Sequence, residues 1–580
     1  MDQEMKKLFS TKMTLGYSLL LLLAVILRFN QLSNPMLGER EAAIALQAAG
    51  SQTGLSGELP GTSGITALLG LVFFVLGKNE FTARLLPAIF GSLLIFAPLL
   101  FRKELGDKTV ILLSILFMFD PGFVAFSRHV DGAIITVCGF LFAVGFVLHR
   151  RYGFAGIAAG FALLGSSVLW PGVLASGLAF WLTYSIKNSR ASSGSGETVP
   201  PVAFEKNDLI NAGLALILTV GLVGSLFFTR LIGIAAPILN LTAYFAGWLT
   251  STEISPFLIL FSFILYQPFI LIAGLVEGLR TVRSGDRMNA FLMRWFYLAV
   301  LLMLIYPSRG MDSILFAYIP LLVLAARCIL RIIESLEQPD IPAWGQMVLV
   351  ILLVPFSWMN ILAIQFPIDG EEEPLRLLAS AGALGLLIVA SFLIRMGWPP
   401  RQGKTGLWMG LAVLIAIFTF STAWRSAGLG KHPEAELWNY DGITDQMDLL
   451  QKTAGDLSEW NVSSREGINI VLLNYSSHAL EWSLKDFTSV SKDSSLPNLS
   501  NPAIVITADE DVPSLAQAYR GQDFVLNRKT SWPLIMPEEW IKWYAFRELP
   551  QETHQVILWA RTDLFPGAAK TAPATITPIQ

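Results

Sequence analysis

The chain has 580 residues, of which 53% are hydrophobic and 15% are charged, and its formal net charge is −3. A soluble domain usually carries about 25% charged residues, so most of this chain is suited to lipid. No basic run indicates a nucleic-acid partner. The chain has two cysteines, Cys138 and Cys328, both in apolar stretches, which excludes a disulfide framework and a four-cysteine metal site.

Apolar stretches recur between residues 13 and 424 and then stop. About 20 apolar residues in a helix cross the roughly 30 Å core of a bilayer. The first stretch, 15–27, follows Lys6, Lys7 and Lys12 and could be part of a signal peptide. Because Arg28-Phe29-Asn30 comes next in place of a small-residue cleavage site, we interpret it as a retained helix.

The positive-inside rule decides the topology, because cytoplasmic loops collect Lys and Arg. If segment 62–77 crossed the membrane, the basic turns at 102–108 and 149–151 would lie opposite the N-terminal lysines. We therefore predict that 62–77 is an interfacial or re-entrant helix. About thirteen spans remain, at 13–29, 82–101, 109–127, 132–148, 153–169, 171–186, 209–228, 255–276, 292–307, 313–330, 343–365, 375–396 and 406–424.

This topology predicts a multi-pass protein of the cell membrane with a cytoplasmic N-terminus. The basic segments at 187–206, 280–294, 327–331 and 395–404 then share the cytoplasmic side. The exterior receives the rest: residues 30–81, 128–131, 229–254, 308–312, 366–374 and everything after Arg425.

The C-terminal part differs in composition from the membrane part. It has a helical pattern at 443–460 and apolar β-type runs at 468–473, 503–507 and 555–560, which predict a small α/β domain. We expect three regions: a transmembrane domain 1–425 with external loop 30–81, an extracytoplasmic α/β domain 426–567, and a disordered tail 568–580 rich in Ala, Thr and Pro.

Three external clusters hold the candidate residues. The first has Glu39 and Glu41 at a predicted helix start, where the helix dipole stabilises acids and gives them a purely structural reason to be there. The second has Arg128 and Asp131 with His129 as a neighbour, and the third has Arg309 and Asp312. In both, an arginine and an acid three residues apart could also form a local ion pair or a stapled turn.

Acids and arginines at one membrane face suit a reaction on a lipid phosphate ester. A carboxylate can take the proton of an attacking hydroxyl, and an arginine or a bound metal can stabilise the leaving phosphate. A transporter would instead place acids at mid-membrane, often in broken helices of two repeated halves. We find no such repeat, and the spans are largely free of acids.

The order of acidic loop, interfacial helix, "FTARLLPAIFGSLLIFAPLLFRKELG" and "FSRHVDGAIITV" resembles the GT-C glycosyltransferases. The similar group is that of the protein O-mannosyltransferases and lipid A aminoarabinose transferases, and the resemblance covers roughly 15–330. Glu41, Arg84, Arg128 and Asp131 match its motif positions. The chain departs from the group's Asp-Glu pair, because Arg40 precedes Glu41 and the second acid is Glu39.

The resemblance implies an inverting glycosyltransferase that moves a hexosyl, such as mannosyl, or pentosyl group. The donor would be a polyprenyl-phosphate sugar, and the acceptor hydroxyl would belong to a protein, lipid or glycan outside the cytoplasm. It implies Glu41 or Glu39 as base and Asp131 binding acceptor or metal. The phosphate and substrate side would include Arg128, Arg309, Asp312, Arg84 and His129.

Two other classes stay open, and so does the cofactor. Because Arg40 stands where the group has an acid, the protein could instead be a non-catalytic membrane scaffold or lipid-flipping partner. A transporter is the other alternative to a glycosyltransferase. A divalent cation is left open as cofactor, because the scattered acids define no ligand set. The C-terminal domain could recognise the acceptor, and its aromatic residues suit either sugar stacking or core packing: Trp482, Trp540, Trp543 and Tyr544.

Overall fold

The computed structural model describes most of the chain and divides it into two compact units. The described residues are 11–50, 62–188, 206–228, 232–364, 373–398, 400–495, 501–509, 513 and 517–565, so the predicted tail 568–580 lies outside them. Unit 1 comprises Met1–Leu32, Glu58–Trp438 and Ile535–Glu548. Unit 2 comprises Ser33–Gly57, Asn439–Leu534 and Leu549–Gln580.

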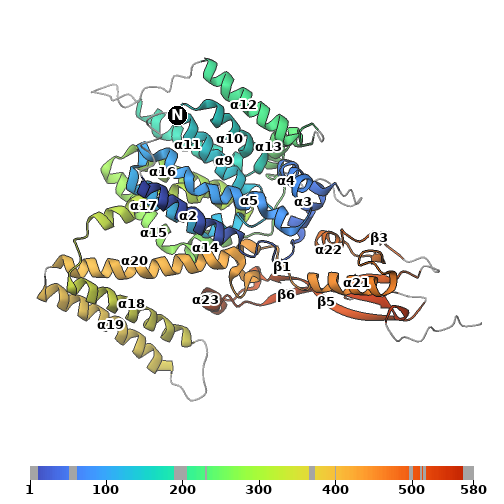
Figure 1. The fold of residues 1–580 in the computed structure, drawn as a ribbon. Coiled ribbons are helices and arrows are strands. Elements are labelled where there is room, and N and C mark those ends of the chain that lie inside the picture. The colour runs from blue at the N-terminus through green and yellow to red at the C-terminus, as the bar shows by residue number, and fades with distance from the viewer. Residues whose placement is uncertain are drawn as a thin grey trace, which may run out of the picture. The chain divides into compact units, whose positions relative to one another are not determined.

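Unit 1 is helical (Figure 1). Its α-helices are α2 (Thr11–Phe29), α4 (Ser63–Leu76), α5 (Glu80–Leu93), α6 (Arg102–Leu105), α7 (Asp107–Phe119), α8 (Pro121–Phe126), α9 (Ala133–Leu148), α10 (Tyr152–Gly165), α11 (Leu169–Asn188), α12 (Lys206–Gly224), α13 (Ala236–Ala246), α14 (Pro256–Tyr266), α15 (Pro268–Ser284), α16 (Arg287–Ile305), α17 (Leu315–Glu334), α18 (Ile341–Ala363), α19 (Glu373–Gly397), α20 (Pro400–Trp424) and α23 (Pro537–Phe546).

The apolar helices make the chain a multi-pass membrane protein. Within the described residues, 7 helices are long and apolar enough to cross a membrane, and a bent pair would be an eighth. Shorter apolar helices accompany them: Met13–Phe29, Ser63–Leu76, Ala133–Leu148, Tyr152–Gly165 and Gly233–Ala246. The number of about thirteen spans, and the interfacial place of 62–77, stay predictions. The helix α13 was not expected in the predicted external loop 229–254.

The outer helices of unit 1 expose the apolar side chains that lipid would cover. The helix α20 packs against α18 and α19, and Figure 1 shows the three as a group. Leu352, Leu378 and Ile388 on these helices are 61%, 68% and 68% exposed. An apolar surface of this extent is unusual for a soluble monomer and suits contact with a bilayer.

Two of the predicted spans, 109–127 and 255–276, contain a break in the helix. The helix α7 ends at Phe119, and α8 begins after Asp120. Helices α14 and α15 meet at Gln267 with a bend of 96°. In both cases a proline follows the break, and a proline disfavours the helical conformation of the residue before it.

Unit 2 contains a six-stranded sheet of order β1-β5-β6-β4-β2-β3. The strands are β1 (Ile443–Thr444), β2 (Asn469–Leu473), β3 (Ser489–Asp493), β4 (Ile504–Ala508), β5 (Tyr519–Thr530) and β6 (Gln551–Arg561). Strand β2 pairs in parallel with β3 and β4, and the other pairs are antiparallel. The predicted apolar runs correspond to β2, β4 and β6, which confirms the α/β domain.

The helices of unit 2 are α3 (Glu39–Ala49), α21 (Met447–Val462) and α22 (His478–Ser483). The predicted helix at 443–460 therefore begins later than expected, because Ile443 and Thr444 pair with β5. The helix α3 packs against α22, so this part of the first external loop groups with the C-terminal sheet. In the other direction, α23 groups with unit 1.

Candidate functional site

The two glutamates of the first cluster have different surroundings in unit 2. The side chain of Glu41 turns back to the start of α3, where its Oε2 accepts a hydrogen bond from the backbone N–H of Gly38 at 3.3 Å. The carboxylate of Glu39 instead accepts from the Ser477 hydroxyl and from the backbone N–H of His478 at 2.8 Å. These contacts hold Glu39, which is 42% exposed, against the start of α22.

Glu39 also lines a cavity of about 180 Å³ in unit 2. The other lining residues come from α21, α22, the segment between β2 and α22, and strands β1, β5 and β6: Thr444, Met447, Tyr475, Ala479, Leu526, Asn527 and His554. Burial, and after it the charge of Glu39, raises the pKa of Tyr475. Its phenol therefore stays protonated near neutral pH and can donate a hydrogen bond.

Arg128, a candidate for binding phosphate, is engaged with the end of α2 in unit 1. Its Nη1 donates to the carbonyl oxygens of Arg28 and Asn30, each at 2.8 Å, and its Nη2 donates to that of Gln31 at 3.3 Å. The last carbonyls of a helix have no partner within the helix. The buried Arg128 side chain supplies partners for those near the end of α2.

Arg28 likewise donates hydrogen bonds to carbonyl groups at the end of α7. Its Nη1 donates to the carbonyl oxygen of Met118 at 3.3 Å and its Nη2 to that of Phe117 at 3.4 Å. The Arg28 side chain is completely buried. Arg128 thus binds carbonyls near the end of α2, the helix that contains Arg28, and Arg28 binds carbonyls at the end of α7. Together the two arginines join α2 to the α7–α8 region.

The remaining second-cluster residues also have local structural contacts. Asp131 accepts from the backbone N–H of Ala133 at 2.6 Å, at the start of α9. No ion pair joins it to Arg128 among the described residues, so the local pair weighed from sequence is absent. The ring of His129 lies 5.9 Å from that of Phe126.

Arg309 and Arg84 bind main-chain carbonyls in unit 1. Arg309 donates from Nη1 to Ile254 at 3.1 Å and from Nη2 to Leu304 at 3.4 Å. Its Nε is buried and has no hydrogen-bond partner within the described residues. Arg84 is buried and donates to the carbonyl oxygen of Leu32 at 3.1 Å. Asp312, on the same loop as Arg309, is also buried.

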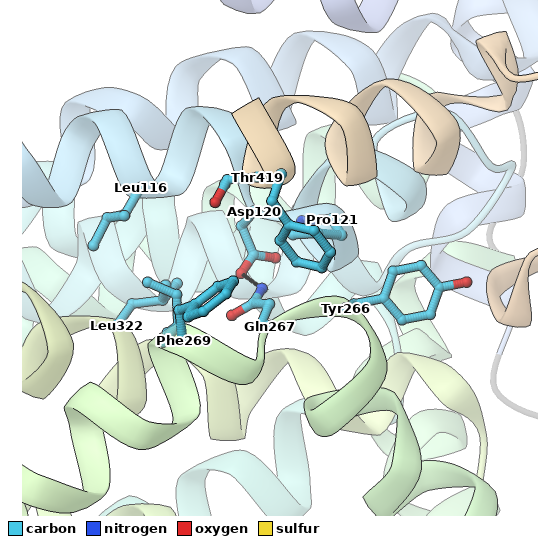
Figure 2. A pocket seen from close by; sticks show the side chains of 10 residues that line it. Leu116, Asp120, Pro121, Tyr266, Gln267, Phe269, Leu322 and Thr419 are labelled. Atoms are coloured by element: carbon cyan, nitrogen blue, oxygen red, sulfur yellow. Dashed lines mark hydrogen bonds between the residues drawn. The ribbon is translucent and has the colours of Figure 1, made fainter. Parts of the chain in front are cut away.

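A polar contact joins the two helix breaks, at Asp120 and Gln267, and the sequence did not predict it. Figure 2 shows Gln267 donating to the Asp120 carboxylate beside a small cavity. Asp120 also accepts from the backbone N–H of Phe123 at 2.8 Å and so begins α8. The sequence signals were the dipeptides Asp120-Pro121 and Gln267-Pro268, but their proximity depends on folding over 147 residues.

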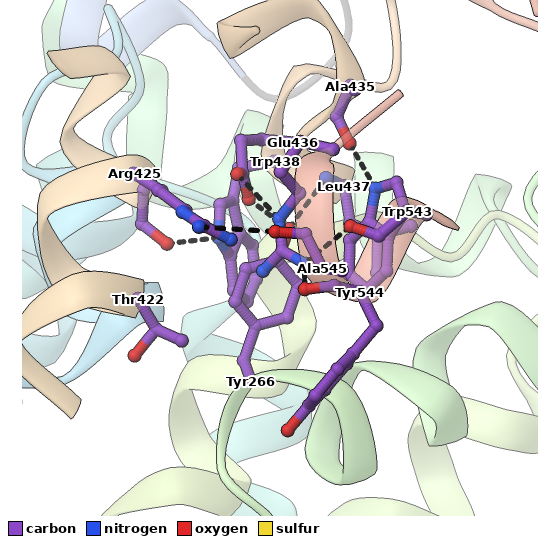
Figure 3. A network of polar contacts seen from close by, with 12 residues as sticks. Tyr266, Thr422, Arg425, Ala435, Glu436, Leu437, Trp438, Trp543, Tyr544 and Ala545 are labelled. Carbon is purple, nitrogen blue, oxygen red and sulfur yellow. Dashed lines mark hydrogen bonds and ion pairs between the residues drawn. The ribbon is translucent and has the colours of Figure 1, made fainter. Parts of the chain in front are cut away.

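A second polar network that was not predicted includes Arg547, the residue after α23. Figure 3 shows its members Tyr266, Glu436 and Trp543. The Nε of Arg547 donates to Glu436 at 2.9 Å, and the Tyr266 hydroxyl donates to the same carboxylate at 2.5 Å. The guanidinium lies 3.8 Å from the centre of the Trp543 ring. The side chains of Arg547 and Glu436, both in unit 1, are 4% and 2% exposed, so this ion pair is buried.

The aromatic residues considered for sugar stacking differ in how far they are buried. Trp482 and Trp543 are buried, and Trp543 donates from its indole N–H to the carbonyl oxygen of Ala435 at 2.6 Å. Packing accounts for both. Trp540 stacks on Phe261 within unit 1, with ring centres 5.5 Å apart.

The described residues contain no group of three or more His, Cys, Asp or Glu that could hold a metal ion. Asp131 is committed to the start of α9. The residues that the structure describes therefore offer no ligand set for the divalent cation left open from the sequence, and we derive no step through one.

In its fold the chain is similar to a solved membrane protein, and this confirms the GT-C-like fold that the resemblance predicted. The chain is similar to the crystal structure of ArnT from Cupriavidus metallidurans bound to undecaprenyl phosphate, with a TM-score of 0.53 and 13% identity over 94% of this chain and 98% of that one. The apo state of that protein gives 0.51 and 14% over the same shares. No protein-family model and no curated protein matches the sequence.

Proposed function

We propose that the protein is a membrane glycosyltransferase that moves a sugar from a polyprenyl-phosphate carrier to a hydroxyl outside the cytoplasm, with inversion. The GT-C fold supports the class, and the ArnT neighbour was crystallised with undecaprenyl phosphate. The observation that carries the proposal is the Glu39 carboxylate, which two hydrogen bonds orient at the wall of a cavity. The group transferred is a hexosyl, such as mannosyl, or a pentosyl group.

The chemistry needs one base and one partner for phosphate. The acceptor oxygen forms a bond to the anomeric carbon from the face opposite the phosphate, while the bond from that carbon to the phosphate oxygen breaks. The base takes the hydroxyl proton, and the phosphate leaves with the electron pair. A positioned base contributes about 10²–10⁴-fold to such a step.

Glu39 is the better candidate for the base. Its carboxylate has about four lone-pair positions and uses two of them for Ser477 and His478, which leaves room for an acceptor hydroxyl. Glu41 occupies the place of a capping-box glutamate, which reaches back to the N–H before the helix. Its position matches the family motif, but its described hydrogen bond serves the start of α3.

Arg309 is the best candidate for the donor phosphate. Among the described residues its buried Nε–H has no hydrogen-bond partner, and the N–H groups of an arginine are donors that bind phosphate. The guanidinium of Arg128 donates hydrogen bonds to main-chain carbonyls at and just after the end of α2, so we assign Arg128 a structural role. The Asp131 carboxylate accepts a hydrogen bond from the backbone N–H of Ala133 at the start of α9. We therefore propose that Asp131 positions the segment before α9.

The proposed location is the cell membrane, with the N-terminus in the cytoplasm and unit 2 outside. The apolar helices support a multi-pass protein. The orientation rests on the distribution of Lys and Arg, which favours the same side for the N-terminus and the segment 187–206.

A second candidate is a non-catalytic scaffold or lipid-flipping partner. One observation favours it: Arg40 stands where the family motif has an acid, and both neighbouring glutamates have structural hydrogen bonds. In such a protein the carrier would bind or cross the membrane with its sugar attached.

The test measures transfer of label from radiolabelled polyprenyl-phosphate sugars to acceptors in membrane extract, with the full chain in lipid. We expect Glu39→Gln to lower the rate by about 10²–10⁴-fold. Glu41→Gln is the matched control, because glutamine also completes a capping box, and it should retain most activity. Equal losses in both variants, or in neither, would contradict the assignment of Glu39, and Asp131→Asn tests the remaining acid.

A further inference from the structure

The cavity of unit 2 is large enough for one sugar ring. Its volume is about 180 Å³, and a cavity of about 150 Å³ in a protein core can hold benzene. A pyranose is also a six-membered ring, and its hydroxyl groups need polar partners. The cavity therefore suits a single saccharide unit better than a long peptide segment or a lipid chain.

A β-bulge gives the cavity two neighbouring residues of one strand. In a regular strand, adjacent side chains point to opposite faces. Both Leu526 and Asn527 nevertheless line the cavity. The pairing of β5 with β6 shifts here, because Val525 pairs with Gln555 and Asn527 pairs with His554, which leaves Leu526 without a partner position. Bulges of this kind redirect side chains and are common beside functional sites.

The lining has the mixture of groups that sugars bind. Met447, Ala479 and Leu526 offer apolar contact. Asn527 has a buried side-chain oxygen without a hydrogen-bond partner among the described residues, and Asn527 and His554 face each other across the strands. Tyr475 supplies a ring and a hydroxyl. Each polar group can bond a sugar hydroxyl, which both donates and accepts.

Charge argues against a phosphate in this cavity. Its described lining contains no Lys or Arg, and the carboxylate of Glu39 is part of its wall. A phosphate placed there would meet a like charge without a compensating cation. The lining therefore suits a neutral ring better than a phosphorylated one.

We propose that this cavity binds a pyranose unit of the acceptor, so that the acceptor is a carbohydrate rather than a peptide or a lipid. The inference rests on the proposed function, in which Glu39 takes the proton of the acceptor hydroxyl. A ring held by Asn527, His554 and Tyr475 lies in the same cavity as Glu39 and can present a hydroxyl to it. Unit 2 thereby supplies acceptor specificity.

The experiment uses the full chain in lipid nanodiscs and a panel of neutral methyl pyranosides of glucose, galactose, mannose and N-acetylglucosamine. Saturation-transfer NMR measures binding of each glycoside, and label transfer from the polyprenyl-phosphate sugars measures whether a bound glycoside becomes the product. We expect at least one glycoside to bind and to receive label.

The variants test whether binding occurs in this cavity. Asn527→Leu and His554→Ala should each weaken binding by about threefold to tenfold, the effect of one lost hydrogen bond. The His554 side chain is exposed, so its removal should leave folding intact. Gln522→Leu is the matched control, because Gln522 lies on the same strand, is exposed and does not line the cavity.

Three results would overturn the inference. Label transfer to a peptide or lipid with no glycoside binding would refute the carbohydrate acceptor and leave the transferase proposal standing. Binding unchanged by both cavity variants would place the sugar elsewhere. Cavity-dependent binding without transfer from any donor would refute the acceptor role together with the proposed function.

Discussion

Arg28 and Arg128 each satisfy carbonyl groups at a helix end. Arg128 bonds carbonyls near the end of α2, and Arg28 bonds those near the end of α7. Buried carbonyls without partners are costly, and the cost is larger where lipid excludes water. This explains two buried arginines without assigning them a ligand.

Loss of the Arg128 guanidinium should destabilise unit 1. Arg128→Leu leaves several carbonyls near the end of α2 without a donor, so we expect the free energy of unfolding to fall by about 2–4 kcal/mol. Thermal unfolding of the purified protein in detergent measures the change. Arg151→Leu is the control, because Arg151 is exposed. An unchanged Tm for Arg128→Leu would contradict the structural role.

The buried pair of Arg547 and Glu436 makes a second residue-scale prediction. Arg547→Met leaves the Glu436 carboxylate buried without its cation, which should cost about 3–5 kcal/mol. Adding Glu436→Gln removes the buried charge while keeping an acceptor for Tyr266, so the double variant should recover much of the loss. Thermal unfolding of single and double variants, with exposed Arg287→Met as control, measures this coupling. Strict additivity of the two changes would refute it.

At the scale of elements, the helix breaks at Asp120 and Gln267 organise the centre of unit 1. Each break lies before a proline, so its position could have been predicted from the sequence. Their mutual contact could not, because no local pattern says which of many polar residues will meet across 147 positions. The same holds for Arg128, whose partners on α2 lie about a hundred residues earlier.

The contact between the breaks is open to measurement. Gln267→Leu removes the donor to the buried Asp120 carboxylate, and we expect a loss of about 1–3 kcal/mol in the free energy of unfolding. Gln338→Leu, at an exposed position in unit 1, is the matched control. If both variants unfold at the wild-type temperature, the Gln267 contact contributes nothing to stability.

The sheet of unit 2 shows where strand prediction succeeds and fails. The apolar runs of β2, β4 and β6 identify them, because their central residues are buried on both faces of the sheet. Strand β3 lies at an edge and is polar except for Val490. Strand β5 is mostly polar, and its only apolar run is the short Phe524–Leu526, so neither strand has a long apolar run. The cavity beside the bulge in β5 could therefore not be predicted from the sequence.

At the scale of the whole molecule, composition and hydropathy predicted the membrane class and the C-terminal α/β domain. The resemblance supplied the GT-C fold, which the ArnT structures confirm at 13% and 14% identity. Likeness at that level concerns the fold alone. Glu39 was among the candidate residues, but its choice over Glu41 depends on the side-chain contacts with Ser477 and His478.

A doubly labelled polyprenyl-phosphate sugar, with one label in the phosphate and the other in the sugar, distinguishes sugar transfer from binding or flipping of the intact carrier. The full chain is reconstituted in liposomes with membrane extract as the source of acceptor. We predict that the sugar label moves to the acceptor while the phosphate label stays on the lipid. If both labels stay together on the lipid, in one leaflet or both, the protein is a scaffold or a flipping partner and not a glycosyltransferase.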